Sequence, residues 1–232
     1  MNISIGTLLS KNQTMTGTLK CQCGQVILRI SDTNPRMKLE CGCCDCRQAL
    51  SWAQIQGGPK LPSHRPIEAI YFGNDIIIES GKENLQWYKL RKEGNSIRWV
   101  ARCCFTTMVV HHPAYMNRIF ATFSDAVEYG GDIPKNIDSI CRIQMKGYPK
   151  DMIKSLTPFS NGGGKIDIKA AEKDSEVLNV YGKFKDEKGL AKAFANATFF
   201  DLHEVESKIG KTTKDYIDEV ENDIIVLGLK EF

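Results

Sequence analysis

The sequence predicts a mainly β domain of antiparallel strands, followed by a C-terminal extension that is partly helical. Short runs rich in β-branched and aromatic residues recur between residues 67 and 123, and glycine-containing turns separate them. Eight of the nine cysteines fall into three groups. Helical patterning returns from about residue 186 onward. We therefore expect an N-terminal segment at 1–15, a cysteine-containing domain at 16–145 and an extension at 146–232.

The chain of 232 residues has the composition of an ordinary globular protein, with 42% hydrophobic and 25% charged residues. Its net charge of +3 is small and diffuse, which argues against a nucleic-acid partner. No apolar stretch approaches the length of a membrane span, and residues 1–14 lack the basic and apolar regions of a signal peptide. Nine cysteines without an export signal favour a reducing compartment, so we expect a cytoplasmic protein with no membrane partner.

The central cysteine group, at residues 41–47, places four thiols within six positions. In a chain without an export signal, thiolates crowded in this way are typical of a zinc site. Cys41, Cys43 and Cys46 form a C-x-C-x-x-C pattern, in which a tight turn aims two sulfurs at one ion and the start of a helix supplies the third. Cys44 falls outside this set, and we interpret it as a spare thiol or a structural residue.

The first cysteine group lies between two strands that are expected to meet at a turn within residues 16–31. Apolar side chains alternate at 26–30, which places them on one face of the second strand. The turn carries Cys21-x-Cys23-Gly24, and a glycine at this point tolerates the positive φ that lets backbone amides face a sulfur. The pattern is typical of half of a metal site, and the alternative is a hairpin with two incidental buried cysteines.

After the central group, residues 47–53 predict a short helix that starts near Cys46, and its amide dipoles favour thiolate there. Glycines and prolines then mark a loop at 57–66. Six β-rich runs follow, from which we expect an antiparallel sheet folded on itself, with metal joining distant hairpins. These runs are 67–72, 76–79, 85–90, 97–102, 107–111 and 118–123.

The third cysteine group, Cys103 and Cys104, follows the strand that carries Trp99. Adjacent side chains on a regular strand face opposite ways, so both sulfurs reach one ion only if the strand ends or bulges there. A closed structural zinc site has four ligands, and Cys21 and Cys23 supply only two of them. We therefore expect at least one ligand from the third group, and whether both bind stays open.

The order of these motifs resembles the glutathione-dependent formaldehyde-activating enzyme family, which includes centromere protein V. The resemblance covers roughly residues 16 to 125. It implies an Mss4-like fold, with antiparallel β-sheets joined by zinc. It also implies a structural zinc held by Cys21, Cys23 and the third group. A second zinc, held by Cys41, Cys43 and Cys46, is implied with an open position where the family's thiol chemistry is proposed to occur.

The sequence departs from the family pattern in the third motif, which is usually C-x-x-C-G-T. Cys104 stands at the place of the second cysteine, Phe105 replaces the glycine and Ala101 occupies the place of the first cysteine. Cys103 is a candidate substitute for that missing ligand. Gly42 also stands where many family members carry histidine. This arrangement is closer to an uncharacterised subgroup of the same superfamily.

Two hypotheses about function follow from the resemblance. The first is a zinc-dependent carbon–sulfur lyase that acts on a thiol adduct of an aldehyde, with glutathione or a similar small thiol as its substrate. The alternative is a non-catalytic zinc module in which both metals are structural and the protein binds a protein partner. The two differ at the second zinc, because an enzyme needs an exchangeable position that Cys44 or Cys103 does not close.

The histidines give no recognisable general base, and His111 and His112 are expected to form an exposed pair at a strand end. The three tryptophans, Trp52, Trp87 and Trp99, are expected in the core. Cys141 lies beyond the metal motifs, and we interpret it as a buried structural thiol.

Helices are expected in the C-terminal extension at 190–194, 202–209 and 216–224. The last of these follows Thr212 and Thr213, either of which is a suitable N-cap. Its acidic residues are most simply a solvated face.

Overall fold

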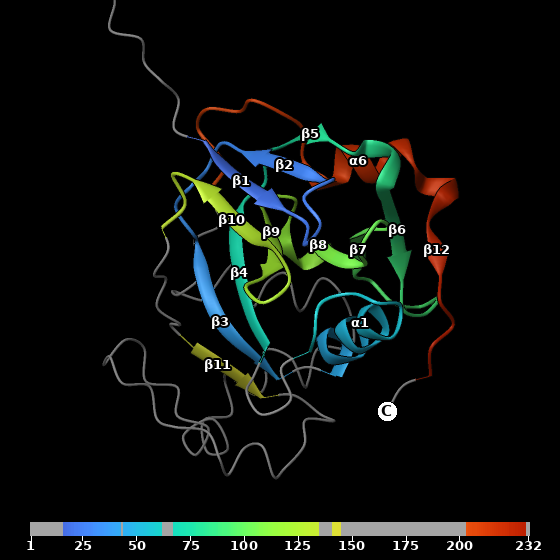
Figure 1. The fold of residues 1–232 in the computed structure, drawn as a ribbon. Helices are drawn as coiled ribbons and strands as arrows, with labels where there is room; N and C mark the ends of the chain where they lie inside the picture. The colour runs from blue at the N-terminus through green and yellow to red at the C-terminus, as the bar shows by residue number, and fades with distance from the viewer. Residues whose placement is uncertain (1–15, 43, 62–66, 135–140, 145–202, 231–232) are drawn as a thin grey trace, which may run out of the picture.

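The computed structural model describes residues 16–42, 44–61, 67–134, 141–144 and 203–230, and this part of the chain is mainly β, as the sequence predicts (Figure 1). The described residues form twelve strands in two sheets, together with the two α-helices α1 and α6. All pairings within the four-stranded sheet are antiparallel, and the eight-stranded sheet is antiparallel except at its two outer strands.

The four-stranded sheet has the order β10-β1-β2-β5. Its strands are β1 (Gly17–Lys20), β2 (Ile27–Ile30), β5 (Ile76–Ser80) and β10 (Glu128–Gly131). The predicted hairpin is therefore confirmed, with β1 and β2 paired on either side of a turn. Val26, Leu28 and Ile30 are all fully buried, as their alternation predicts.

The eight-stranded sheet has the order β11-β3-β4-β9-β8-β7-β6-β12. Together with β5, its strands β4 and β6 to β9 account for all six β-rich runs predicted from the sequence. The parallel outer strands, β11 and β12, come from later parts of the chain. Its strands are β3 (Met37–Gly42), β4 (Ile67–Gly73), β6 (Leu85–Lys89), β7 (Ile97–Ala101), β8 (Thr106–His111), β9 (Ile119–Phe123), β11 (Cys141–Gln144) and β12 (Ile225–Val226).

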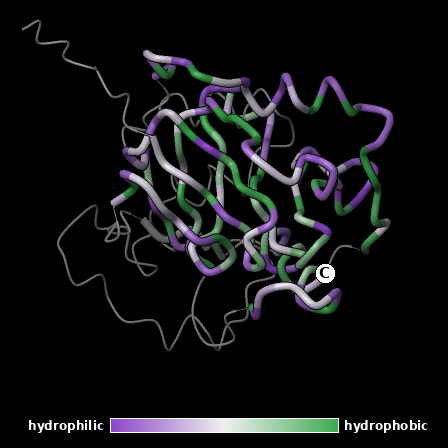
Figure 2. The backbone as a smooth tube through the Cα atoms, turned by 45° about the horizontal axis from the view of Figure 1, so that its top comes forward, coloured by the Kyte–Doolittle hydropathy of each residue, from purple (hydrophilic) through white to green (hydrophobic). Residues whose placement is uncertain are grey.

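The largest hydrophobic core joins residues of both sheets, including Leu28 of the smaller sheet and Phe72 and Phe120 of the larger one. Hydrophobic residues lie along the strands in the middle of the molecule (Figure 2). Trp87 and Trp99 are in this core as predicted, with ring centroids 5.6 Å apart. Burial of such aromatic rings is a major source of stability in a β-rich domain.

Helix α1 (Cys44–Ile55) packs on the other face of the larger sheet. Its Ala49 lies against Tyr88 and Val100, and Trp52 packs partly buried beside them instead of entering the main core. The predicted helix near Cys46 is confirmed, and it begins two residues earlier, at Cys44. The two faces of the larger sheet therefore carry different layers.

The C-terminal residues 203–230 pack against the cysteine-containing domain. Lys211 exchanges backbone hydrogen bonds with Ile76, and β12 lies beside β6. Helix α6 (Thr213–Glu219) starts at a capping box formed by Thr212 and Asp215, which confirms the predicted threonine cap. The described end of the extension is therefore bound to both sheets.

The helix predicted at 202–209 is wrong for the described residues 203–209, which contain no helix. The backbone amides of Ile209 and Gly210 instead donate to the fully buried carboxylate of Asp75, at 2.6 and 2.8 Å. This tertiary contact overrides the local helical pattern. Helix α6 also ends at Glu219, before the predicted 224, and a short 3-10 turn follows it. The helix predicted at 190–194, the segment 1–15 and the boundary at 145 lie outside the described residues.

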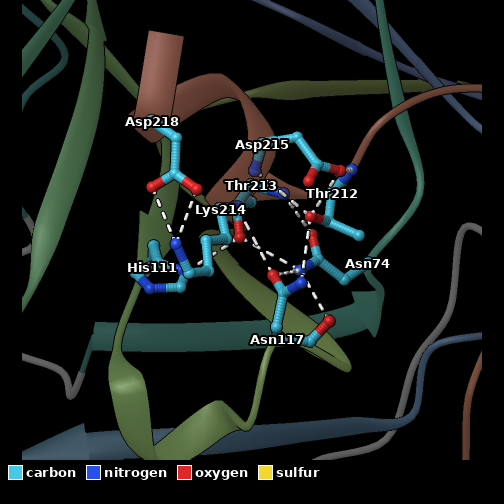
Figure 3. A network of polar contacts seen from close by, with 8 residues as sticks. All are labelled: Asn74, His111, Asn117, Thr212, Thr213, Lys214, Asp215 and Asp218. Carbon is cyan, nitrogen blue, oxygen red and sulfur yellow. Dashed lines mark hydrogen bonds and ion pairs between the residues drawn. The ribbon is translucent and has the colours of Figure 1, made fainter. Parts of the chain in front are cut away.

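A buried polar network holds the start of α6 (Figure 3). The amide of Asn74 donates to Thr213 Oγ1 and to Asn117 Oδ1, and its Oδ1 accepts from the Thr213 backbone N–H at 2.9 Å. His111 Nδ1 lies 2.8 Å from Thr213 Oγ1. His111 is only 8% exposed, so the expectation of an exposed histidine pair is wrong, because a segment a hundred residues downstream covers this strand end.

Acid should weaken this network through His111, whose pKa is lowered to about 4 by burial and by the nearby His112 and Lys214. The unfolded chain then binds more protons between about pH 6.5 and pH 4, so stability is complete above this range and is lost as the pH falls through it. We expect His111→Asn to reduce this loss by up to about 1.4 kcal/mol per pH unit. Urea unfolding at several pH values measures it.

The exposed His203→Asn variant is the matched control and should keep the wild-type pH dependence. Any acid sensitivity that comes from thiolates is common to all three proteins, so the difference between them isolates His111. An identical pH dependence in His111→Asn and wild type contradicts the assignment.

Candidate metal centre

Four cysteines from two distant turns come together. Cys21 and Cys23 lie in the turn between β1 and β2, and Cys103 and Cys104 lie in the turn between β7 and β8. All four Sγ atoms are within 4.8 Å of one another. The separations are 3.5 Å for Cys21–Cys23, 3.9 Å for Cys21–Cys103, 3.3 Å for Cys23–Cys103 and 4.0 Å for Cys103–Cys104. The first and third cysteine groups thus meet, and both members of the third group take part.

The first turn is shaped to present sulfur. Gly24 has a φ of +77°, as expected for its place after the second cysteine, and its N–H donates to the Cys21 carbonyl at 2.8 Å. The N–H of Val26 donates to Cys21 Sγ at 3.2 Å. A backbone amide aimed at a sulfur stabilises the thiolate form that a metal requires.

The second turn shows how the adjacent side chains of Cys103 and Cys104 can face the same side. Strand β7 ends at Ala101, and the N–H of Cys104 donates back to the Ala101 carbonyl at 3.1 Å. Phe105 then has a φ of +47°, in the left-handed region. Because the strand ends here, both sulfurs can face the same side. From the sequence alone, we could not decide whether the strand ends at this point and so whether both cysteines can contribute.

Thr106 joins the two turns, a role that the sequence motif did not reveal. The residue is fully buried, and its Oγ1 accepts a hydrogen bond from the Gln22 N–H at 3.0 Å. The same oxygen lies 3.2 Å from Cys104 Sγ. A hydroxyl at this point therefore fixes one turn against the other and orients a sulfur of the cluster.

The pKa values of three thiols of the cluster are shifted in different directions. Burial raises the pKa of Cys21, against the opposing hydrogen bond from the Val26 amide. Burial also raises the pKa of Cys103, with a further contribution from its contact with Cys23. Burial works in the same direction on Cys104, but hydrogen bonds from Thr106 and from backbone amides lower its pKa to about 7. A bound divalent cation would let all four ionise together.

The geometry and the donors fit zinc. Four sulfurs around a zinc ion, each at about 2.3 Å, lie about 3.8 Å from one another in a tetrahedron. The four Sγ–Sγ separations given above lie on both sides of this value. An all-sulfur set is also suited to a borderline-soft ion and unsuited to calcium or magnesium. The cluster could therefore hold a zinc ion in a closed site.

The second cysteine group is described only in part. Cys41 is near the end of β3 and is 8% exposed, and Cys46 is half-buried in the first turn of α1. Both pack into one apolar cluster with Leu50. Cys43 and the side chain of Cys44 lie outside the described residues, so the three-cysteine site stays a prediction.

Cys141 is the first residue of β11, which pairs with β3. Its side chain lies outside the described part of the chain, so its predicted burial stays a prediction. Among the described residues, Cys21, Cys23, Cys103 and Cys104 are the only histidine, cysteine or carboxylate group found with metal-binding spacing. No helix in the described ranges has the length and apolar character needed to cross a membrane.

Comparisons of the chain with models of protein families, with curated proteins and with solved structures find no match. The fold and the cluster define a mainly β protein with four cysteines placed to bind a metal ion.

The left-handed Phe105 offers a test of the second turn. Alanine at this position keeps the strained backbone and loses the ring contact with Trp52, whose centroid lies 5.9 Å away. Glycine loses the same contact but relieves the strain. We expect Phe105→Gly to be more stable than Phe105→Ala by about 1 kcal/mol, measured by urea unfolding of the zinc-loaded proteins. Equal stability of the two variants would show that Phe105 carries no backbone strain.

Proposed function

We propose that this protein binds a structural zinc ion through Cys21, Cys23, Cys103 and Cys104. The observation that carries the proposal is the approach of the four Sγ atoms within 4.8 Å, from turns about eighty residues apart in the sequence. Three of these thiols are buried or half-buried and only Cys23 is exposed, so ionising them side by side without a metal would be costly. A shared cation offsets that cost and satisfies all four sulfurs.

The zinc would connect the two sheets, since one turn belongs to the four-stranded sheet and the other to the eight-stranded sheet. A crosslink that closes a loop of this length lowers the entropy of the unfolded chain, which raises its free energy by about 4 kcal/mol in a chain-entropy estimate. Folding and metal binding are then coupled, because the ligands converge only in the folded protein. This is the expected behaviour of a structural site and requires no catalytic step.

Zinc content tests the first site. The double variant Cys21→Ser/Cys103→Ser removes one ligand from each turn and should lose about one zinc ion per chain. Its free energy of unfolding should fall by about 3 kcal/mol or more. Elemental analysis and denaturant unfolding, on protein purified without added metal, give the two readouts.

Cys141→Ser is the matched control, because it removes a thiol that lies outside the three groups. This variant should keep the wild-type zinc content. A double variant that retains all of its zinc sinks the assignment of the first site.

We further propose a second zinc at Cys41, Cys43 and Cys46, as the resemblance to the formaldehyde-activating family implies. Two observations support it: Cys41 and Cys46 pack into the same apolar cluster, and α1 begins between them. The positive end of the helix dipole favours thiolates in the first turn. A zinc held by three thiolates supplies an open position that lowers the pKa of an incoming thiol.

The reaction that we propose for this site is the addition of a thiol to formaldehyde, or its reversal. The thiolate sulfur attacks the carbonyl carbon, a C–S bond forms, and the π bond of the carbonyl breaks. The resulting alkoxide takes up a proton equivalent to the one that the thiol lost, which gives a hydroxymethyl thioether. With glutathione as the thiol, the reverse reaction is that of a carbon–sulfur lyase.

The triple variant Cys41→Ser/Cys43→Ser/Cys46→Ser tests the second site. We expect zinc to fall from about two ions to about one per chain, with the fold intact. The rate of adduct formation from formaldehyde and glutathione should fall to the uncatalysed level. Cys141→Ser should keep both zinc ions and the wild-type rate.

The outcome also separates the two hypotheses about function. If the triple variant loses one zinc ion but the wild-type protein does not accelerate the reaction, a non-catalytic zinc module that binds a protein partner is favoured. A single zinc ion that survives the triple change removes the second site altogether.

A further inference from the structure

Arg98 is a buried cation that forms no ion pair with the described residues. It lies on β7 and is 2% exposed. Arg36 and Arg91 each pair with a carboxylate, at 2.6 and 2.9 Å. None of the ion pairs formed by the described residues includes Arg98, and its Nε has no hydrogen-bond partner among them. A guanidinium keeps its charge in a protein, so an isolated one in the interior is costly.

Arg98 faces the side of the larger sheet that α1 covers. Its cross-strand partner is Tyr88, and directly paired residues project to the same face. Tyr88 packs with Ala49 of α1, whereas the neighbouring Trp99 points into the core between the sheets. The guanidinium therefore belongs to the layer between the sheet and α1. The carboxylate of Asp45, on the first turn of this helix, is paired with Arg91.

Tyr88 adds a second donor beside the guanidinium. Its side chain is 1% exposed, and within the described ranges its hydroxyl makes no hydrogen bond of normal geometry. Burial raises the pKa of Tyr88, although the charge of Arg98 and the neighbouring hydroxyl of Thr107 partly oppose this. The phenol stays protonated at neutral pH and can donate a hydrogen bond.

His112 adds a third donor. Its Nδ1 accepts a hydrogen bond from the Ala114 N–H at 3.0 Å, so the neutral ring carries its proton on Nε2. Burial and the charge of Arg98 together lower the pKa of His112 to about 4, against the opposing charge of Asp45. The ring is therefore neutral at physiological pH, and Nε2–H is available as a donor.

A fixed positive charge and neutral donors in one enclosed layer complement an anion with several acceptor oxygens. We propose that Arg98, Tyr88 and His112 form a binding site for a compact anionic group of a small molecule, either a carboxylate or a phosphate. The group must be compact, because Arg98 and Tyr88 are almost completely enclosed. The site adjoins Cys46, which contributes to the raised pKa of Tyr88, but it does not require a metal at the second cysteine group.

Thermal unfolding of the full chain, loaded with zinc, tests the proposal at constant ionic strength. Inorganic phosphate and acetate are titrated separately, with chloride as the replaced anion. At least one of them should raise the wild-type Tm in a saturable way, since a ligand that binds only the folded state stabilises it. A response to phosphate alone identifies a phosphoryl group, and a response to acetate alone identifies a carboxylate.

Arg98→Met should weaken the apparent affinity for the effective anion by about tenfold or more. Without anion it should unfold at a higher temperature than wild type, because an uncompensated buried charge has been removed. Arg102→Met is the matched control, since Arg102 follows the same strand but is exposed, and it should keep the full response. If Arg98→Met does not fold, Tyr88→Phe replaces it and should weaken the response several-fold.

Two results overturn the site: no saturable rise in wild-type Tm with either anion, or an equal response in wild type and in the Arg98 or Tyr88 variant. Cys46→Ser separates this proposal from the second zinc. The response should survive that change, and its loss would mean that the anion binds a metal and not Arg98. If only the proposal of a second zinc fails, the anion still raises the Tm of Cys46→Ser and of wild type equally.

Discussion

The contact between two turns at the cysteine cluster is the constraint on which the arrangement of the sheets depends. Sulfurs from the β1–β2 turn and the β7–β8 turn approach within 4.8 Å, and Thr106 fixes the same two turns through a hydrogen bond to the Gln22 amide. The turns belong to different sheets, and the large core lies between those sheets. The contacts of the cysteine cluster and of Thr106, together with the apolar core between the sheets, therefore hold the same two layers. A metal at the edge would restrict the unfolded chain, while the buried side chains stabilise the folded one.

The larger sheet separates two environments by the simple alternation of side chains along its strands. On β7, Trp99 enters the core between the sheets and the adjacent Arg98 faces α1. At the end of β8, His111 contacts Thr213 at the start of α6, whereas His112 is influenced by the charges of Arg98 and Asp45. Neighbouring residues in sequence thus serve different purposes, one securing the C-terminal segment and the other lining the layer beneath α1.

The strands and the first hairpin could be predicted because their signals are local. Alternating apolar residues and glycine turns located all six β-rich runs between 67 and 123. Gly24 was identified from its position after Cys23, and it has the expected positive φ. The helix predicted at 202–209 failed because the amides of Ile209 and Gly210 bind Asp75, more than 130 residues earlier. The exposure expected for His111 failed for a similar reason, since no local pattern announces the segment that covers it.

The sequence by itself determined the secondary structure around the cysteines and the groups from which metal ligands would come. Spacing identified Cys21 and Cys23 as partners, and the need for four ligands pointed to the third group. Only the tertiary structure decided that Cys103 and Cys104 both join them, because this depends on where β7 ends and on the left-handed Phe105. That Arg98 forms no ion pair with the described residues likewise appears only when the layers are assembled, since an ion pair depends on neighbours in space and not on neighbours in sequence.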